Sequence, residues 1–262
     1  MIKKNHRLLV IDIGNSNIDL GIYKGSQLLT KQNISTRKNG TAYEYFVFIQ
    51  KIIETANDNQ QIDAVIACSV VPQLTKIIFD SAKQIGCNKF FEVSSSTNLD
   101  MTIDLDNPEE LGADRLVNAY GAFLKHQQFV IVVDYGTATT FDVISQSGVY
   151  LGGVICAGLK LNLDSLARKT AKLPLIDMAI PDNIIGKNTI TSMQSGIIFG
   201  HGAMSDGLID KIALEENKKP IVIATGGLAN IMHKISNNID LVDNHLTIWG
   251  LMNIYYKFFA DS

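Results

Sequence analysis

The chain has 262 residues, of which 46% are hydrophobic and 19% charged, a composition typical of a globular protein with a sizeable core. Its net charge of −3 argues against a surface dedicated to nucleic acid. The three cysteines are scattered, and no apolar run is long enough for a signal peptide or a membrane span. We therefore expect a cytoplasmic protein with neither nucleic-acid nor membrane partners.

The first part of the chain has the pattern of an α/β layer. Its apolar periodicity predicts strands over 8–10, 19–23 and 27–35, a helix over 41–56, a strand over 63–69, a helix over 71–86 and a strand over 90–93. Pro72 suits the first turn of the second helix. Strands that alternate with helices in this order are typical of an α/β fold.

The rest of the chain starts a strand meander again. The pattern predicts a helix over 108–124, strands over 129–134, 140–145 and 148–155, helices over 162–171 and 192–216, a strand over 221–225 and a closing helix over 246–259. The meander restarts near 116–128, at the end of the first of these helices. We therefore predict two domains, 1–117 and 118–262.

Two segments share one pattern, an apolar strand that ends in Asp-x-Gly and continues through small polar residues into a second apolar strand. Leu8–Tyr23 reads LLVIDIGNSNIDLGIY, and Val130–Ile144 reads VIVVDYGTATTFDVI. The backbone N–H groups of such a turn can cradle phosphate, and the carboxylate of Asp12 or Asp134 can hold a cation. A hairpin with a polar tip is the simpler interpretation of one copy. Two copies favour two related halves that face one ligand.

The segment Asp106–Arg115 reads DNPEELGADR and could carry chemistry of its own. Gly112 and Ala113 are small enough for a ligand to approach the backbone. Asp114 could accept a proton from a substrate hydroxyl, and Arg115 could bind a carboxylate or phosphate. Adjacent residues point to different helix faces, so we expect no direct pair between them. A salt bridge on the helix surface, without a function, is the alternative for both.

Taken together, seven stretches resemble the type III pantothenate kinases, in the order in which that family has them. They are VIDIGNSNIDLGIY, DNPEELGADRLVNAYGA, VVDYGTATTFDVI, YLGGVICAGL, ARKTAKLP, PDNIIGKNTITSMQSGIIFG and ATGGLA. The family belongs to the sugar-kinase, Hsp70 and actin superfamily. The resemblance implies an α/β fold of two ribonuclease-H-like (actin-like) halves, each a mixed five-stranded sheet with flanking helices, and ATP in the cleft between them.

The resemblance also implies a reaction, the ATP-dependent phosphorylation of pantothenate to 4′-phosphopantothenate, which is the first step of coenzyme A biosynthesis. Its implied cofactors are ATP, Mg²⁺ and a monovalent cation, K⁺ or NH₄⁺. The implied partners are the two substrates and a second copy of the chain in a homodimer, with the pantothenate pocket at the subunit interface.

Carried over by position, the resemblance assigns roles to individual residues. The ATP phosphates would contact the first Asp-x-Gly segment through Asp12, Gly14, Asn15, Ser16, Asn17 and Asp19. Asp12 would also lie near Mg²⁺, in part through water. Asp134 would bind the monovalent cation, and Thr137 would contact ATP phosphate.

The implied pantothenate site is separate from these phosphate contacts. It would comprise Gly112, Ala113, Asp114, Arg115 and, from the second subunit, Thr189. Asp114 would be the catalytic proton acceptor. One position departs from the family, because many relatives have an aromatic residue where this chain has Leu105. The resemblance therefore does not decide whether pantothenate contacts the chain at Leu105.

Two other functions are compatible with the same fold, since fold does not fix function. One is another small-molecule kinase of the superfamily, against which the 112–115 segment argues. The other is a regulatory protein with an actin-like fold and no enzymatic activity, which would be marked by the loss of Asp114 or Asp134. Both aspartates are present.

Overall fold

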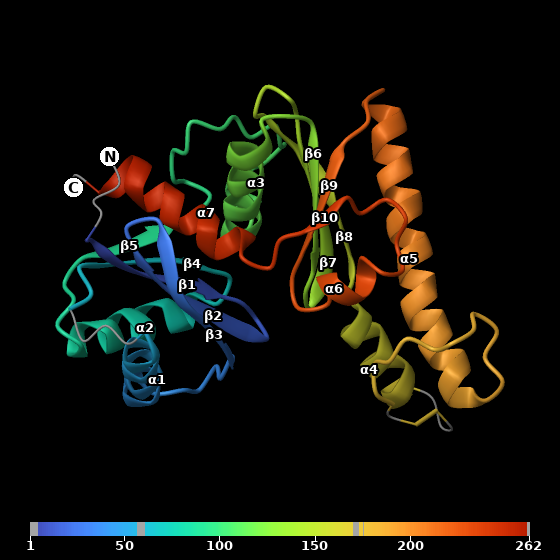
Figure 1. Cartoon of the computed structure of the whole chain (residues 1–262), viewed down its shortest axis with the longest axis horizontal. Coiled ribbons are helices and arrows are strands. Elements are labelled where there is room, and N and C mark those ends of the chain that lie inside the picture. Colours follow the sequence, from blue (N-terminus) through green and yellow to red (C-terminus); the bar gives the residue numbers. More distant parts are fainter. Residues whose placement is uncertain (1–4, 57–60, 170–172, 175, 261–262) are drawn as a thin grey trace. The chain divides into compact units, whose positions relative to one another are not determined.

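The structure is a computed structural model that describes residues 5–56, 61–169, 173–174 and 176–260 (Figure 1). The chain forms two compact units that are not continuous in sequence. Unit 1 consists of Met1–Met101, Asp106–Gly121 and His245–Ser262, and unit 2 consists of Thr102–Leu105 and Ala122–Asn244. The division into domains 1–117 and 118–262 stays a prediction.

Unit 1 is built on a mixed sheet of five strands in the order β3-β2-β1-β4-β5. Their bounds are β1 Arg7–Ile13, β2 Asn17–Lys24, β3 Gln27–Ser35, β4 Ala64–Ser69 and β5 Phe90–Val93. β1 is antiparallel to β2 and parallel to β4. The central strand is fully buried from Leu8 to Ile11, because helices cover both of its faces.

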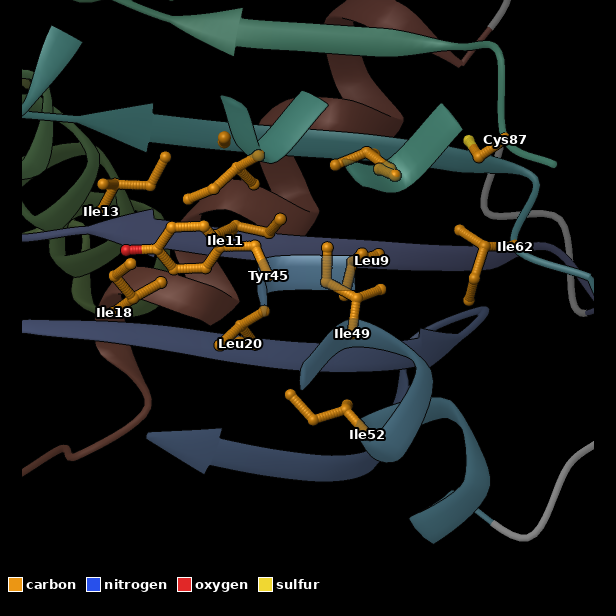
Figure 2. Packing of buried hydrophobic residues seen from close by; sticks show 14 of the residues in the cluster. Leu9, Ile11, Ile13, Ile18, Leu20, Tyr45, Ile49, Ile52, Ile62 and Cys87 are labelled. Carbon is orange, nitrogen blue, oxygen red and sulfur yellow. The ribbon is translucent and has the colours of Figure 1, made fainter. Parts of the chain in front are cut away.

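The helices of unit 1 are α1 Ala42–Thr55, α2 Pro72–Gln84, most of α3 Ala113–His126, and α7 Leu246–Ile254. On one face of the sheet, Leu9, Ile11 and Ile13 of β1 form a core with Tyr45 and Ile49 of α1 (Figure 2). α7 packs against β1, β2 and β4. The π-helical turn Tyr255–Phe259 continues α7.

Unit 2 repeats the topology of unit 1, with the sheet order β10-β9-β6-β7-β8. The strands are β6 Val130–Tyr135, β7 Ala138–Ile144, β8 Tyr150–Ala157, β9 Ile221–Thr225 and β10 Leu241–Val242. β6 is antiparallel to β7 and parallel to β9, as β1 is to β2 and β4. The prediction of two mixed five-stranded sheets with flanking helices is thus confirmed.

One face of the second sheet is covered by α4 Leu159–Lys169, α5 Thr189–Glu215 and α6 Ala229–Met232. Their apolar residues form one cluster with the inward side chains of β6, among them Ile131 and Val133. The repeated strand order gives a structural basis for the repeated Asp-x-Gly pattern, because both aspartates occupy the end of a central strand.

The structure corrects the expected elements at three places. The helix predicted over 108–124 is a 3-10 turn at Pro108–Glu110 and then α3, with extended backbone at Leu111 between them. α6 and β10 were not predicted, since four and two residues are too short to show a period. The last two residues of the helix predicted over 162–171 lie outside the described residues, as does part of ARKTAKLP.

Among the helices that the structure describes, none is long and apolar enough to cross a membrane.

Candidate active site

The first Asp-x-Gly segment forms the hairpin between β1 and β2. Asp12 pairs with Asp19 across the hairpin, and the Gly14 N–H donates to the carbonyl of Asn17 over 3.0 Å. Asn15, Ser16 and Asn17 are exposed at the tip. A β-carbon on Gly14 would lie 2.8 Å from the Asn17 carbonyl oxygen, so this tight turn requires glycine. The tip therefore offers short donors to a ligand.

Four contacts hold this hairpin from β3 and the residue that follows it. The Thr36 hydroxyl donates to the Gly14 carbonyl over 2.6 Å, and the Thr36 N–H donates to the Ser16 carbonyl over 2.9 Å. Asp19 accepts from the Asn33 amide over 2.7 Å and forms an ion pair of 3.6 Å with Lys31. Sequence reasoning did not identify Thr36, because the contact joins residues 22 positions apart.

A buried thiol lies beside Asp12. Cys68 lies one residue before the end of the parallel strand β4, in register with Asp12, and its Sγ donates to Asp12 Oδ1 over 3.3 Å. Cys68 is completely buried. Burial, and then the negative charges of Asp12 and Asp114, raise the pKa of the thiol well above its ordinary value. Cys68 is therefore a protonated donor at neutral pH.

Asp114 lies in the first turn of α3, where the N-terminal helix dipole favours a carboxylate. Its Oδ1 accepts from the Arg115 N–H over 2.8 Å. Partial burial nonetheless raises the pKa of the Asp114 carboxyl above its ordinary value of 3.8, although the Arg115 N–H and charge oppose the shift. A carboxylate with a raised pKa is a better proton acceptor than an ordinary aspartate.

The approach to Asp114 is set by the glycine two residues before it. A β-carbon on Gly112 would lie 2.7 Å from Asp114 Oδ1, and the Gly112 carbonyl accepts the Leu116 N–H at the start of α3. Gly112 therefore lets the carboxylate fold back over the backbone. Because the charges of Asp114 and Asp12 both act on the Cys68 thiol, unit 1 gathers these two acids in one region.

The second Asp-x-Gly segment forms the hairpin between β6 and β7 and is one residue shorter at its tip. Asp134 pairs with Thr140, and the Gly136 N–H donates to the Ala138 carbonyl over 3.0 Å. Thr137 is exposed at the tip, and Asp134 is partly buried. The two hairpins therefore place their aspartates alike but present different donors.

Two glycines from other segments pack against this second hairpin. Gly226 of the ATGGLA stretch has φ +88°, and a β-carbon there would lie 2.3 Å from Asp134 Oδ1. A β-carbon on Gly158 would lie 2.3 Å from the Thr137 carbonyl oxygen. The sequence signal was the presence of both glycines, but their contacts required the tertiary structure.

Thr189 begins α5 and is exposed, one residue after the N-cap Asn188. It lies at a cavity of about 650 Å³. The cavity is lined by Leu166, Leu173, Thr189, Ser192, Met193, Gly196 and Ile197.

Leu105, at the position that departs from the family, lies 3.8 Å from where a β-carbon on Gly152 would be.

Within the described ranges, no three histidine, cysteine or acidic side chains converge on a common point that could hold a metal ion. Mg²⁺ does not need such a cage when a nucleotide is present. It binds through one or two carboxylates together with substrate phosphates and water. Asp12, the predicted Mg²⁺ contact, fits that requirement as a single carboxylate beside the turn at Gly14.

Solved structures resemble the whole fold at low sequence identity. A conserved putative Baf family transcriptional activator from Campylobacter jejuni matches with TM-score 0.58 and 18% identity over 95% of this chain and 97% of its own. Component A of (R)-2-hydroxyglutaryl-CoA dehydratase from Acidaminococcus fermentans matches with TM-score 0.55 and 16% identity, over 94% and 95% of the two chains. These likenesses show the two-lobed actin-like fold.

Sequence comparison identifies much nearer relatives. A type III pantothenate kinase from Geotalea daltonii is 41% identical over 251 residues, which cover 95% of this chain and 98% of the relative. One from Geotalea uraniireducens is 42% identical over the same shares. The family model described as type III pantothenate kinase matches residues 8–211, which include both hairpins and Asp114. The chain therefore belongs to the type III pantothenate kinase family.

Proposed function

We propose that this chain phosphorylates pantothenate with Asp114 as the group that accepts the proton of the substrate's primary alcohol. The reaction itself follows from the family: ATP is the phosphate donor, pantothenate is the acceptor, and the product enters coenzyme A biosynthesis. The observation that supports the role of Asp114 is a partly buried carboxylate with a raised pKa, in the first turn of a helix and beside Gly112, whose lack of a β-carbon leaves room for it.

Phosphoryl transfer asks the protein mainly to position the reactants and to stabilise charge. Gly112 and Ala113 would admit pantothenate to the backbone at the start of α3, and Arg115 would hold its carboxylate. Asp114 would orient the alcohol and take its proton as the oxygen attacks the γ-phosphate. The raised pKa suits this transfer, because the proton moves to a carboxylate that binds it more readily than usual.

Each hairpin has proposed phosphate and cation contacts of its own. In unit 1, Asn15, Ser16 and Asn17 would supply N–H and side-chain donors at the turn that Gly14 makes possible, and Asp12 would hold Mg²⁺, in part through water. Asp19 would act from within the sheet, because Asn33 and Lys31 already bind it. In unit 2, Asp134 would hold K⁺ or NH₄⁺, and Thr137 would contact phosphate. When bound, these cations would offset negative charge on the transferred group.

We also propose a cytoplasmic homodimer in which Thr189 completes the pantothenate pocket of the partner. Large apolar side chains are exposed around the start of α5 and on β8 and α4, which is unusual for a surface that stays in water. They are Ile155, Leu161, Leu166, Ile184, Ile185 and Ile190. Light scattering coupled to size-exclusion chromatography should give twice the chain mass, and a monomer would contradict this proposal.

The test of the proposed function is pantothenate-dependent release of ADP, measured in a coupled assay with Mg²⁺ and with or without K⁺. We expect release only with pantothenate present, strong activation by K⁺, and a product heavier than pantothenate by one phosphate in mass spectrometry. Other hydroxy acids serve as controls for a kinase of different specificity. The absence of pantothenate-dependent ADP release under both conditions would contradict the assignment.

The contact between Cys68 and Asp12 makes a separate prediction. Replacing Cys68 with alanine removes the donor to Asp12, and we expect the Mg²⁺ concentration for half-maximal activity to rise roughly fivefold, as for a hydrogen bond of about 1 kcal/mol. Cys68→Ser should keep the wild-type Mg²⁺ requirement, because a hydroxyl donates a hydrogen bond at least as well as a thiol. Cys87→Ala, at another buried cysteine of unit 1, is the matched control. An equal effect of both alanine variants would show a packing defect instead.

A further inference from the structure

Unit 2 contains a buried polar side chain that the roles above do not use. His201 lies in the middle of α5 and is 5% exposed, facing the sheet rather than solvent. Its Nε2 is 2.9 Å from the hydroxyl oxygen of Thr139, which is completely buried. Its ring also contacts Tyr135 edge-on, with 6.0 Å between ring centroids. Burying a histidine ring costs free energy unless the ring is hydrogen-bonded, and the bond to Thr139 offsets that cost.

The two residues that His201 contacts are the two ends of the second hairpin's tip. Tyr135 and Thr139 pair across β6 and β7, and only Gly136, Thr137 and Ala138 lie between them. A hydrogen bond buried in a low dielectric is stronger than one in water, because no solvent competes for either partner. Burial lowers the pKa of His201, so the pair is neutral at neutral pH and carries no charge cost.

We infer that His201 is a positioning residue: through Thr139 it fixes the base of the second hairpin, and so the place of Thr137 and Asp134 relative to the ATP phosphates and the monovalent cation. This inference rests on the roles proposed for that hairpin. It assigns α5 a task in nucleotide binding, in addition to carrying Thr189 at its N-terminus. The first hairpin is held differently, by Thr36, which acts from the chain next to it.

The inference is tested with His201→Leu and Thr139→Val, each of which removes one partner of the bond at similar volume. Loss of one buried hydrogen bond should raise the KM for ATP and the K⁺ concentration for half-activation roughly five- to tenfold. The KM for pantothenate should change less than twofold, because its proposed contacts around Asp114 lie in unit 1 and Thr189 lies at the start of α5, about three helical turns before His201. Thr139→Ser keeps the hydroxyl and should behave as the wild type.

The double variant shows whether the two residues act through one hydrogen bond or whether each change damages the protein independently. If both residues act through one bond, His201→Leu with Thr139→Val should raise the KM for ATP no more than either change alone. His201→Gln, which can still reach Thr139, covers the case in which the leucine variant fails to fold. Equal increases in the KM for ATP and for pantothenate, or none in a folded variant, would overturn the inference.

A direct measurement of ATP binding separates the test of His201 from the test of the proposed function. The dissociation constant of Mg²⁺–ATP, measured by calorimetry without pantothenate, should rise by the same factor as the KM. A wild type that binds ATP but releases no ADP with pantothenate would contradict the proposed function and leave the role of His201 to be judged from the binding data. Unchanged ATP binding in His201→Leu and Thr139→Val would contradict the role of His201 alone.

Discussion

Replacing Asp114 with asparagine is expected to reduce kcat by a factor of about 10² to 10⁴ while leaving the fold and ATP binding unchanged. Asparagine has nearly the same shape and can still accept the Arg115 N–H, so the start of α3 should persist. It cannot take a proton from the substrate alcohol. Steady-state kinetics with pantothenate and calorimetry with Mg²⁺–ATP measure the two halves of this prediction.

The same variant should be at least as stable as the wild type at neutral pH. The pKa of Asp114 is raised in the folded protein, so its contribution to stability is fully present below the unfolded value of 3.8 and is lost as pH rises through the folded pKa. At pH 7 the partly buried charge therefore costs stability, and asparagine removes that cost. Thermal unfolding should show an equal or higher Tm at pH 7.

Glu109→Gln is the matched control for Asp114→Asn, because it removes an exposed carboxylate from the same segment. It should change neither kcat nor Tm appreciably. Near-normal kcat in Asp114→Asn would exclude Asp114 as the proton acceptor. A lower Tm at pH 7 would instead show that the carboxylate has a structural role that asparagine does not fill.

Replacing Gly226 with alanine is expected to damage both stability and activity. The positive φ of 88° strains any side chain, and the new β-carbon would lie 2.3 Å from Asp134 Oδ1 and 2.8 Å from the carbonyl carbon of Tyr135. Backbone strain of this kind costs about 1–3 kcal/mol. The carboxylate of Asp134 would also have to move, so activation by K⁺ should be weakened or lost.

The adjacent glycine supplies the control for that experiment. A β-carbon on Gly227 would meet no atom within 4 Å, so Gly227→Ala should leave the Tm and the K⁺ response nearly unchanged. Chemical denaturation and K⁺ titration of the coupled assay measure the two effects. If Gly226→Ala keeps a wild-type response to K⁺, Asp134 does not hold the monovalent cation.

Much of the framework could be predicted from local pattern. The strand-Asp-x-Gly-strand pattern is set by residues next to one another, and the structure places both copies at hairpins in sheets of the same topology. α1 begins after Thr41, whose hydroxyl and Glu44 form a capping box. Helix caps and strands of this kind can be predicted from the sequence, because the residues that determine them lie within a few positions of one another.

The remaining features depend on contacts between distant residues. Cys68 meets Asp12 only because β4 pairs with β1 in one register, and Gly226 meets Asp134 only because β9 lies beside β6. The bond between His201 and Thr139 joins residues 62 positions apart. The sequence has no local period that would predict these pairings. The same holds for the extended backbone at Leu111, after which α3 begins at Ala113.

The central claim is that Asp114 takes the proton of pantothenate, and the pH dependence of kcat/KM for pantothenate tests it most directly. Because the essential base must be ionised, kcat/KM should fall on the acid side with an apparent pKa above 3.8, the ordinary value for aspartate. The residual activity of Asp114→Asn should lack this acid limb. An acid limb that survives unchanged in Asp114→Asn would contradict the account.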